Sequence, residues 1–133
     1  MTERFVLDCS VTVAWCFEGE QSDYADEILD RFNDSSALVP QLWLLEVGNV
    51  LVVAERRDRI DESESVRFLS LLESLPIEVS QWLDLSETRS LISLARQHEL
   101  SVYDAHYLWL AMQEDLPMAT LDENLRQAAN QTG

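Results

Sequence analysis

The chain has 133 residues, of which 47% are hydrophobic, with only three glycines and three prolines. This composition supports one compact domain and excludes a disordered chain or two domains joined by a flexible linker. Nine arginines and no lysine stand against 25 acidic residues, for a net charge of −16. Such a surface repels a nucleic acid backbone at long range and attracts divalent cations or a basic protein partner, although acidity also serves solubility alone.

The sequence carries no sign of export or of membrane insertion. Its first eight residues lack the basic start and the apolar stretch of a signal peptide. The longest nearly apolar run, residues 42–54, is too short to cross a bilayer and contains Glu46. Cys9 and Cys16 are expected to be buried thiols rather than a disulfide. We therefore expect a soluble, cytoplasmic protein that does not engage a membrane.

Apolar spacing and turn residues predict short strands that alternate with helices. In chain order the predicted elements are a strand at 4–7, a short helix at 11–18, a helix from 22–23 to about 33, a strand at 37–39, a helix at 41–57, a helix that 61–64 opens, a strand at 76–79, a helix that begins at 83–84, a helix from about 104 to 114, a strand at 117–120, and a helix that Asp122 caps and that ends near 130. This alternation predicts an α/β fold with a mostly parallel sheet flanked by helices. In such sheets, ligands bind beyond the carboxyl ends of the strands.

The helix over residues 41–57 is apolar nearly all round, so we expect it to be buried. Glu46 lies inside it. Burying an isolated carboxylate is costly, so such a group pairs with an arginine, reaches water at an edge, or binds a metal ion. The residue pattern leaves the structural and the functional explanations of Glu46 equally open.

Three aspartates stand where predicted helices begin. Asp8 and Asp122 follow strands, and Asp104 starts a helix. Helix capping or a turn explains each of them singly, and Ser10 is an alternative cap near Asp8. Thr120, two residues before Asp122, directs its side chain the same way along its strand. If these acids converge with the glutamate, their like charges require a cation, and Mg²⁺ or Mn²⁺ suits oxygen ligands.

Other site chemistries lack their residues. There is no glycine-rich loop with lysine for a phosphate-binding loop, no lysine for a phosphate-accepting receiver domain, and no Gly-x-Ser-x-Gly for a serine hydrolase. The first strand is followed by Asp8-Cys9-Ser10 rather than the Asp-x-Asp of haloacid-dehalogenase phosphatases. His98 and His106 are expected to be ordinary surface or core residues, with a minor site role open for His106 beside the third aspartate.

Two further features lie between residues 56 and 72. The basic residues of the chain cluster only at Arg56, Arg57 and Arg59. They form either a solvated helix end that the helix dipole favours or a contact for phosphates. In the next helix, Val66, Leu69 and Leu72 are expected to face inward.

Four segments together resemble the PIN domain, and more closely the VapC-type toxins of bacterial and archaeal toxin–antitoxin pairs. They are Phe-Val-Leu-Asp-Cys-Ser-Val from Phe5, Leu-Trp-Leu-Leu-Glu-Val-Gly-Asn-Val-Leu from Leu42, Leu-Ser-Val-Tyr-Asp-Ala-His-Tyr from Leu100, and Ala-Thr-Leu-Asp-Glu-Asn-Leu from Ala119. The resemblance runs over nearly the whole chain, with the motifs in the family's order. It implies one PIN domain over residues 1–133, a three-layer α/β/α sandwich around a mostly parallel sheet of short strands.

The resemblance also implies the site. By position, the acidic quartet of the family matches Asp8, Glu46, Asp104 and Asp122. These four are implied as metal ligands and, together with Thr120, as catalytic residues. Thr120 matches the hydroxyl residue before the last aspartate, and Ser10 matches the one after the first. Cys9 departs mildly from the small or hydroxyl residue that the family often has there.

The function that this resemblance implies is that of a toxin in a type II toxin–antitoxin pair. Such a toxin is a magnesium- or manganese-dependent endoribonuclease that hydrolyses single-stranded RNA. It is typically a homodimer, and a cognate basic antitoxin holds it inactive, also as a toxin–antitoxin hetero-oligomer. A catalytically inactive PIN-type protein-binding module is the alternative, although the intact quartet favours catalysis. A metal-dependent nuclease that acts on DNA flaps is a third alternative, but such enzymes are usually larger.

Overall fold

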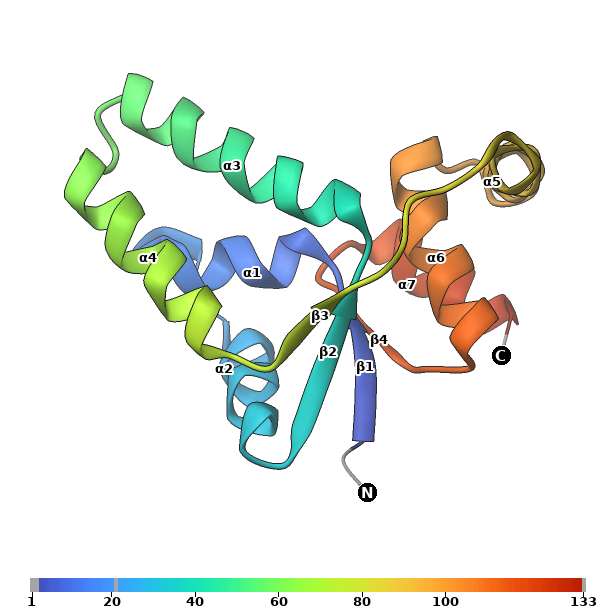
Figure 1. The fold of residues 1–133 in the computed structure, drawn as a ribbon, viewed down its shortest axis with the longest axis horizontal. Helices are drawn as coiled ribbons and strands as arrows, with labels where there is room; N and C mark the ends of the chain where they lie inside the picture. The colour runs from blue at the N-terminus through green and yellow to red at the C-terminus, as the bar shows by residue number, and fades with distance from the viewer. Residues whose placement is uncertain (1–2, 21, 133) are drawn as a thin grey trace.

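The computed structural model describes residues 3–20 and 22–132, which form a central sheet with helices on both sides (Figure 1). The elements are β1 (Glu3–Leu7), α1 (Cys9–Cys16), α2 (Asp23–Asp30), β2 (Ser35–Val39), α3 (Gln41–Arg56), α4 (Glu62–Ser74), β3 (Ile77–Val79), α5 (Leu85–His98), α6 (Val102–Glu114), β4 (Met118–Ala119) and α7 (Glu123–Thr132). Short 3₁₀ turns lie at Glu18–Glu20 and Arg31–Asn33. None of the helices in this described part of the chain is long and apolar enough to span a membrane.

The sheet has the strand order β3-β2-β1-β4, and every pairing is parallel. Helices α1 to α4 lie on one side of it and α5 to α7 on the other (Figure 1). The predicted α/β/α fold with a parallel sheet of short strands is therefore confirmed.

The order of the strands reverses at β1, which has β2 on one side and β4 on the other. In doubly wound sheets, ligands bind in the crevice that such a reversal opens at the carboxyl ends of the strands. Asp8 directly follows β1, and its backbone N–H donates to the carbonyl of Ala119 in β4 at 3.0 Å. The turn after β4 carries Asp122. The topology thus brings two of the predicted acids to one end of the sheet.

Hydrogen bonds from two tryptophans fix α1 against its neighbours. The Nε1 of Trp43, in α3, donates to the buried Thr12 hydroxyl of α1 at 3.0 Å. On the other side of α1, the Nε1 of Trp15 donates to the Ala25 carbonyl of α2 at 2.7 Å. Since α1 begins right after Asp8, these bonds also hold the helix of Glu46 near the end of β1. Both cysteines of α1 are free thiols, as predicted, but only Cys9 is buried and Cys16 is half-buried.

The prediction that α3 is buried all round is wrong for its outer face. Its exposed large apolar side chains are Leu44 (46% exposed), Leu45 (65%) and Val52 (43%). Trp43, Val47 and Leu51 are buried on the inner face. The helix packs on α1 with its inner side, and its outer side is largely exposed. Glu46 lies at the boundary of the two faces and is half-buried.

The predicted inward face of α4 is also partly wrong. Val66 is 57% exposed and Leu69 is 41% exposed, and only Leu72 is buried as expected. Ser65 is buried in place of Val66, because its hydroxyl donates to Glu55 of α3 at 2.6 Å. Phe68 packs against the core on the same face as Ser65 and Leu72, so Val66 and Leu69 face outward.

Candidate active site

Asp8 is buried at the carboxyl end of β1. It occupies the N-cap position of α1, yet its side chain makes no capping hydrogen bond. Its Oδ2 instead accepts hydrogen bonds from the hydroxyls of Ser10 (2.6 Å) and Thr120 (2.8 Å). Burial raises the pKa of Asp8 against the lowering effect of these bonds, and the nearby charge of Asp122 raises it further. Capping therefore does not explain this carboxylate, which two hydroxyls hold in place.

The two hydroxyls also join the end of β1 to the turn after β4. Thr120 is buried, and its Oγ1 accepts from the backbone N–H of Asp122 at 3.0 Å. The Oγ of Ser10 accepts from the backbone N–H of Leu121 at 2.9 Å. The position of Asp122 is thereby tied to that of Asp8.

Asp122 serves as the cap that the sequence predicted. Its Oδ1 accepts from the backbone N–H of Leu125 at 3.0 Å, in the first turn of α7. Arg126 of the same helix points to other partners: it donates to the Thr120 carbonyl at 2.9 Å and lies 3.9 Å from Glu123. The cap uses one oxygen of Asp122, so its role as a cap does not prevent the other oxygen from binding a ligand.

Glu46 of α3 reaches across to α6. Its Oε1 accepts a hydrogen bond from the hydroxyl of the fully buried Tyr107. Burial raises the pKa of Glu46, the tyrosine bond lowers it, and the charges of Asp8 and Asp104 raise it. Burial and the bond to Glu46 raise the pKa of Tyr107. The partner of Glu46 is thus a neutral hydroxyl rather than the arginine that one structural explanation required.

Asp104 does not cap its helix. The cap of α6 is Ser101, whose hydroxyl accepts from the Asp104 backbone N–H at 3.0 Å. Burial raises the pKa of the Asp104 carboxyl, and the charges of Asp8 and Asp122 raise it further. The capping explanation is therefore wrong for Asp104, and its carboxylate interacts with the charges of two others.

Electrostatic coupling links all four predicted acids. The pKa values of Asp8, Glu46 and Asp104 are each raised by at least one other member of the set, and no basic side chain acts on any of the three. Cys9 adds no thiolate, because burial raises its pKa to about 12. The donor set is therefore oxygen only and carries uncompensated negative charge, which fits a hard divalent cation.

The carboxylates of the four acids do not point toward one common centre. Among residues 3–20 and 22–132, no three His, Cys, Asp or Glu side chains are arranged to hold a metal ion as they stand. The chemistry of the donors fits a divalent ion, and binding one would require the side chains to rotate toward a common point.

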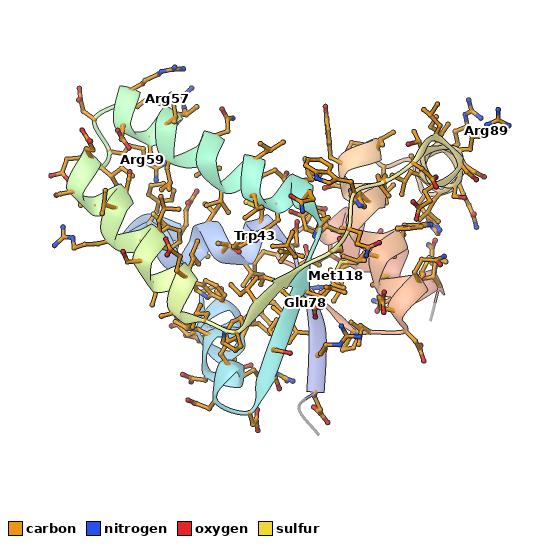
Figure 2. All side chains as sticks on the ribbon, in the orientation of Figure 1. Trp43, Arg57, Arg59, Glu78, Arg89 and Met118 are labelled. Atoms are coloured by element: carbon orange, nitrogen blue, oxygen red, sulfur yellow. The ribbon has the colours of Figure 1, made fainter. Side chains whose placement is uncertain are left out.

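The arginine cluster lies away from these acids. Arg57 and Arg59 stand at the far end of α3 (Figure 2). Arg57 follows Glu46 by eleven residues, a separation of roughly 16 Å along a helix. The guanidinium of Arg59 lies over the ring of Phe17, 4.2 Å from its centre. The cluster therefore leaves the charge of the carboxylates unneutralised.

Comparison with known proteins identifies the fold family. The sequence matches the PIN domain over residues 5–131. The chain belongs to the PIN domain family. The crystal structure of PAE2754 from Pyrobaculum aerophilum superposes with a TM-score of 0.72 at 23% sequence identity, and the match covers 96% of this chain and 87% of that one. No curated protein matches the chain.

Membership in this family agrees with the chemistry of the site. PIN domains are generally nucleases that depend on a divalent metal ion. The PIN match spans all four predicted acids and the hydroxyls of Ser10 and Thr120. Tyr107 was not predicted from the sequence; its position three residues after Asp104 puts it on the same side of α6 and was the available signal.

Neutralising Glu46 should stabilise the metal-free protein. Because its pKa is raised in the folded chain, the folded state holds this proton more tightly than the unfolded state. The free energy of unfolding therefore falls as the pH rises from the ordinary glutamate pKa of about 4.3 through the raised value, and the loss persists above it. Glu46→Gln keeps an acceptor for Tyr107 and removes the charge, so urea unfolding in EDTA should show it more stable than the parent at pH 7.

The exposed Glu27→Gln in α2 is the matched control, since it makes the same chemical change away from the site. It should show no such gain. The advantage of Glu46→Gln should shrink as the pH is lowered toward 4.3. Equal stability of Glu46→Gln and the parent from pH 4.5 to 7 would show that Glu46 is not under repulsion.

Proposed function

We propose that this protein is a VapC-type toxin of a type II toxin–antitoxin pair, a magnesium- or manganese-dependent endoribonuclease that cleaves single-stranded RNA. The observation that carries the proposal is a set of mutually repelling carboxylates, without a basic partner, at the carboxyl edge of a PIN-domain sheet. The proposed metal ligands are Asp8, Glu46, Asp104 and Asp122.

We propose a separate task for each group. Asp8, Asp104 and Asp122 would hold one or two ions, and Glu46 would complete the shell directly or through water. When bound, a divalent ion lowers the pKa of a coordinated water and offsets negative charge on the scissile phosphate. The hydroxyls of Thr120 and Ser10 both donate hydrogen bonds to Oδ2 of Asp8. These bonds would fix the direction in which Oδ1 of Asp8 points.

Tyr107 is the positioning residue for Glu46. It donates to Oε1 of Glu46 from the buried side of α6. Partners that orient a metal-binding carboxylate typically change metal affinity or activity by about 10–100-fold when they are lost. Tyr107 thus performs for Glu46 the orienting role that the two hydroxyls perform for Asp8.

The alternative is a PIN-type protein-binding module without catalysis. One observation favours it: the described acids are not arranged to hold an ion as they stand. A module that only binds proteins, however, gains nothing from burying several carboxylates without counter-charges, because each such burial destabilises the fold. Catalysis is therefore the function that the site supports best.

Asp8→Asn should abolish metal-dependent cleavage of single-stranded RNA and leave the fold intact. The change keeps the shape and one acceptor oxygen, and it removes the negative charge at the centre of the coupled set. We expect a loss of more than about 100-fold, beyond the range seen for residues that only orient a ligand. Asp104→Asn should behave in the same way.

The measurement is gel analysis of a labelled single-stranded RNA with Mn²⁺ or Mg²⁺, with circular dichroism to verify folding. Glu27→Gln should cleave as fast as the parent. Undiminished cleavage by both purified aspartate variants would contradict the proposed mechanism, and no cleavage by the folded parent on any RNA would favour the non-catalytic alternative.

The proposed partner is a cognate antitoxin with a basic segment that places arginine among the carboxylates and competes with the metal ion. The charge of −16, and the absence of a basic side chain acting on Asp8 or Asp104, support this kind of partner. We also propose a homodimer, alone or within a toxin–antitoxin hetero-oligomer, on the resemblance to VapC-type toxins.

The affinity for such an antitoxin should fall steeply with ionic strength. Opposite charges dominate the encounter, and salt screens them, with a Debye length of about 8 Å at 0.15 M. Titration calorimetry from 50 to 500 mM NaCl measures the effect, and Asp122→Asn should weaken both the affinity and its salt dependence. An affinity that does not change with salt would remove the charge argument for this partner.

A further inference from the structure

Arg126 lies at the edge of the sheet, beside the proposed metal site. β4 is the last strand in the order β3-β2-β1-β4, and α7, which carries Arg126, follows it along the chain (Figure 1). The Nη2 of Arg126 donates to the carbonyl of Thr120 at 2.9 Å. The hydroxyl of the same threonine donates to Asp8 at 2.8 Å. A single residue therefore links this guanidinium to a carboxylate of the site.

Contacts from both layers of the fold hold the guanidinium in position. Arg126 belongs to the layer of α5 to α7, yet its Cζ lies 5.3 Å from the centre of the ring of Tyr24, in α2 of the opposite layer. The bond to Thr120 fixes the other side of the group. A planar guanidinium that is already oriented loses little conformational freedom when it binds an anion.

Most donors of this guanidinium remain available to a ligand. An arginine side chain has five N–H donors. The bond from Nη2 is the only hydrogen bond that the side chain of Arg126 makes within residues 3–20 and 22–132. Its Nη1 lies 3.9 Å from Oε2 of Glu123, which is beyond hydrogen-bond distance, and the side chain is 44% exposed. Holding the turn after β4 therefore uses only a small part of what the group can bind.

A cavity of about 460 Å³ adjoins Arg126, between β4 and the helices α6 and α7. Among the described residues that line it, only Arg126 is basic. Asn130 lies one turn further along α7, on the same face, and adds an amide. Asp115 also lines the cavity but forms no ion pair within the described chain. Pockets for small molecules measure about 300–1,000 Å³, so this cavity has room for one nucleotide.

We propose that Arg126 binds a phosphate of the RNA strand next to the phosphate that is cleaved. The inference rests on the proposed nuclease function and names a substrate-binding residue for it. The scissile phosphate would lie over the four carboxylates, and the neighbouring nucleotide would occupy the cavity along α7. Arginine suits this contact, because its fork of donors matches two phosphate oxygens at once.

Electrostatics supports an anion at this arginine. No basic side chain acts on the raised pKa values of Asp8 and Asp104. Arg126 is therefore near the carboxylates without neutralising them, and its own charge is left for a ligand. RNA needs such a contact, because a net charge of −16 repels its backbone and the other clustered arginines lie at the far end of α3.

The test measures binding of a labelled 12-nucleotide single-stranded RNA by fluorescence anisotropy, with Ca²⁺ as the divalent ion and a gel to verify that the RNA stays intact. Arg126→Gln should weaken binding by about ten-fold, as expected for one charged hydrogen-bonded contact. It should also lower the slope of log affinity against log salt by about 0.7, the value for one phosphate contact to a single strand. Arg126→Lys should keep the slope of the parent.

Arg57→Gln is the matched control, because it removes the same charge at the far end of α3, and it should change neither quantity. A second measurement needs no variant. The parent is titrated with RNAs in which one linkage at a time is an uncharged methylphosphonate, and one linkage beside the cleaved one should weaken binding by a similar factor. If no such linkage matters, the proposal fails.

Absence of RNA binding by the parent, or equal losses in Arg126→Gln and Arg57→Gln, would also overturn the proposal. So would an Arg126→Gln protein that keeps its affinity and salt slope but loses kcat with Mn²⁺, because Arg126 would then act only by holding Thr120. Cleavage of the same RNA with Mn²⁺ separates the two claims. If the parent does not cleave but the binding pattern holds, the nuclease function fails and the phosphate site stands. If Arg126→Gln cleaves with the KM of the parent, the phosphate site fails and the nuclease function stands.

Discussion

Like-charged carboxylates, partly buried together without a counter-charge, are the constraint on which the rest of this structure depends. Asp8, Glu46 and Asp104 each have a raised pKa because burial and neighbouring acids disfavour their charged forms. A fold tolerates such a group only where other interactions hold it in place. The parallel sheet provides the position, because β1 and β4 are neighbours and both end at the same edge.

Neutral hydrogen-bond donors orient the acids without cancelling their charge. Hydroxyls from Ser10 and Thr120 hold Asp8, and the Tyr107 hydroxyl holds Glu46. An arginine in any of these places would stabilise the metal-free protein and would block a cation. Hydroxyl donors leave the negative charge of the carboxylates in place, whereas guanidinium groups would neutralise it, and this agrees with the divalent-metal dependence that is general in the PIN domain family.

The sequence predicted the framework well because apolar runs and turn residues act locally. The strand end at Leu7 and the cap at Asp122 follow from such local signals, and the last strand ends at Ala119, one residue before its predicted end. The cap of α6 was predicted wrongly, because Ser101 lies three residues earlier and takes that role from Asp104. Both residue types are good caps, so propensity alone could not choose between them.

Tertiary contacts decided the remaining differences. The inward face of α4 carries Ser65, which bonds to Glu55, and Phe68, which packs against the core, so Val66 faces solvent. Leu45 is exposed although its helix is apolar, because it lies on the face of α3 that turns away from α1. The partnership of Glu46 with Tyr107 spans 61 residues of sequence, and periodicity carries no information about such pairs.

Measurement of Mn²⁺ binding by electron paramagnetic resonance tests whether the four carboxylates form a metal site. A chain with a charge of −16 attracts divalent ions over its whole surface, so the comparison must separate a defined site from a diffuse atmosphere. We predict saturable binding of one or two ions to the parent and to Glu27→Gln, and loss of that binding in Asp8→Asn. Equal Mn²⁺ binding by all three proteins would contradict it, because the ions would then follow overall charge rather than the four carboxylates.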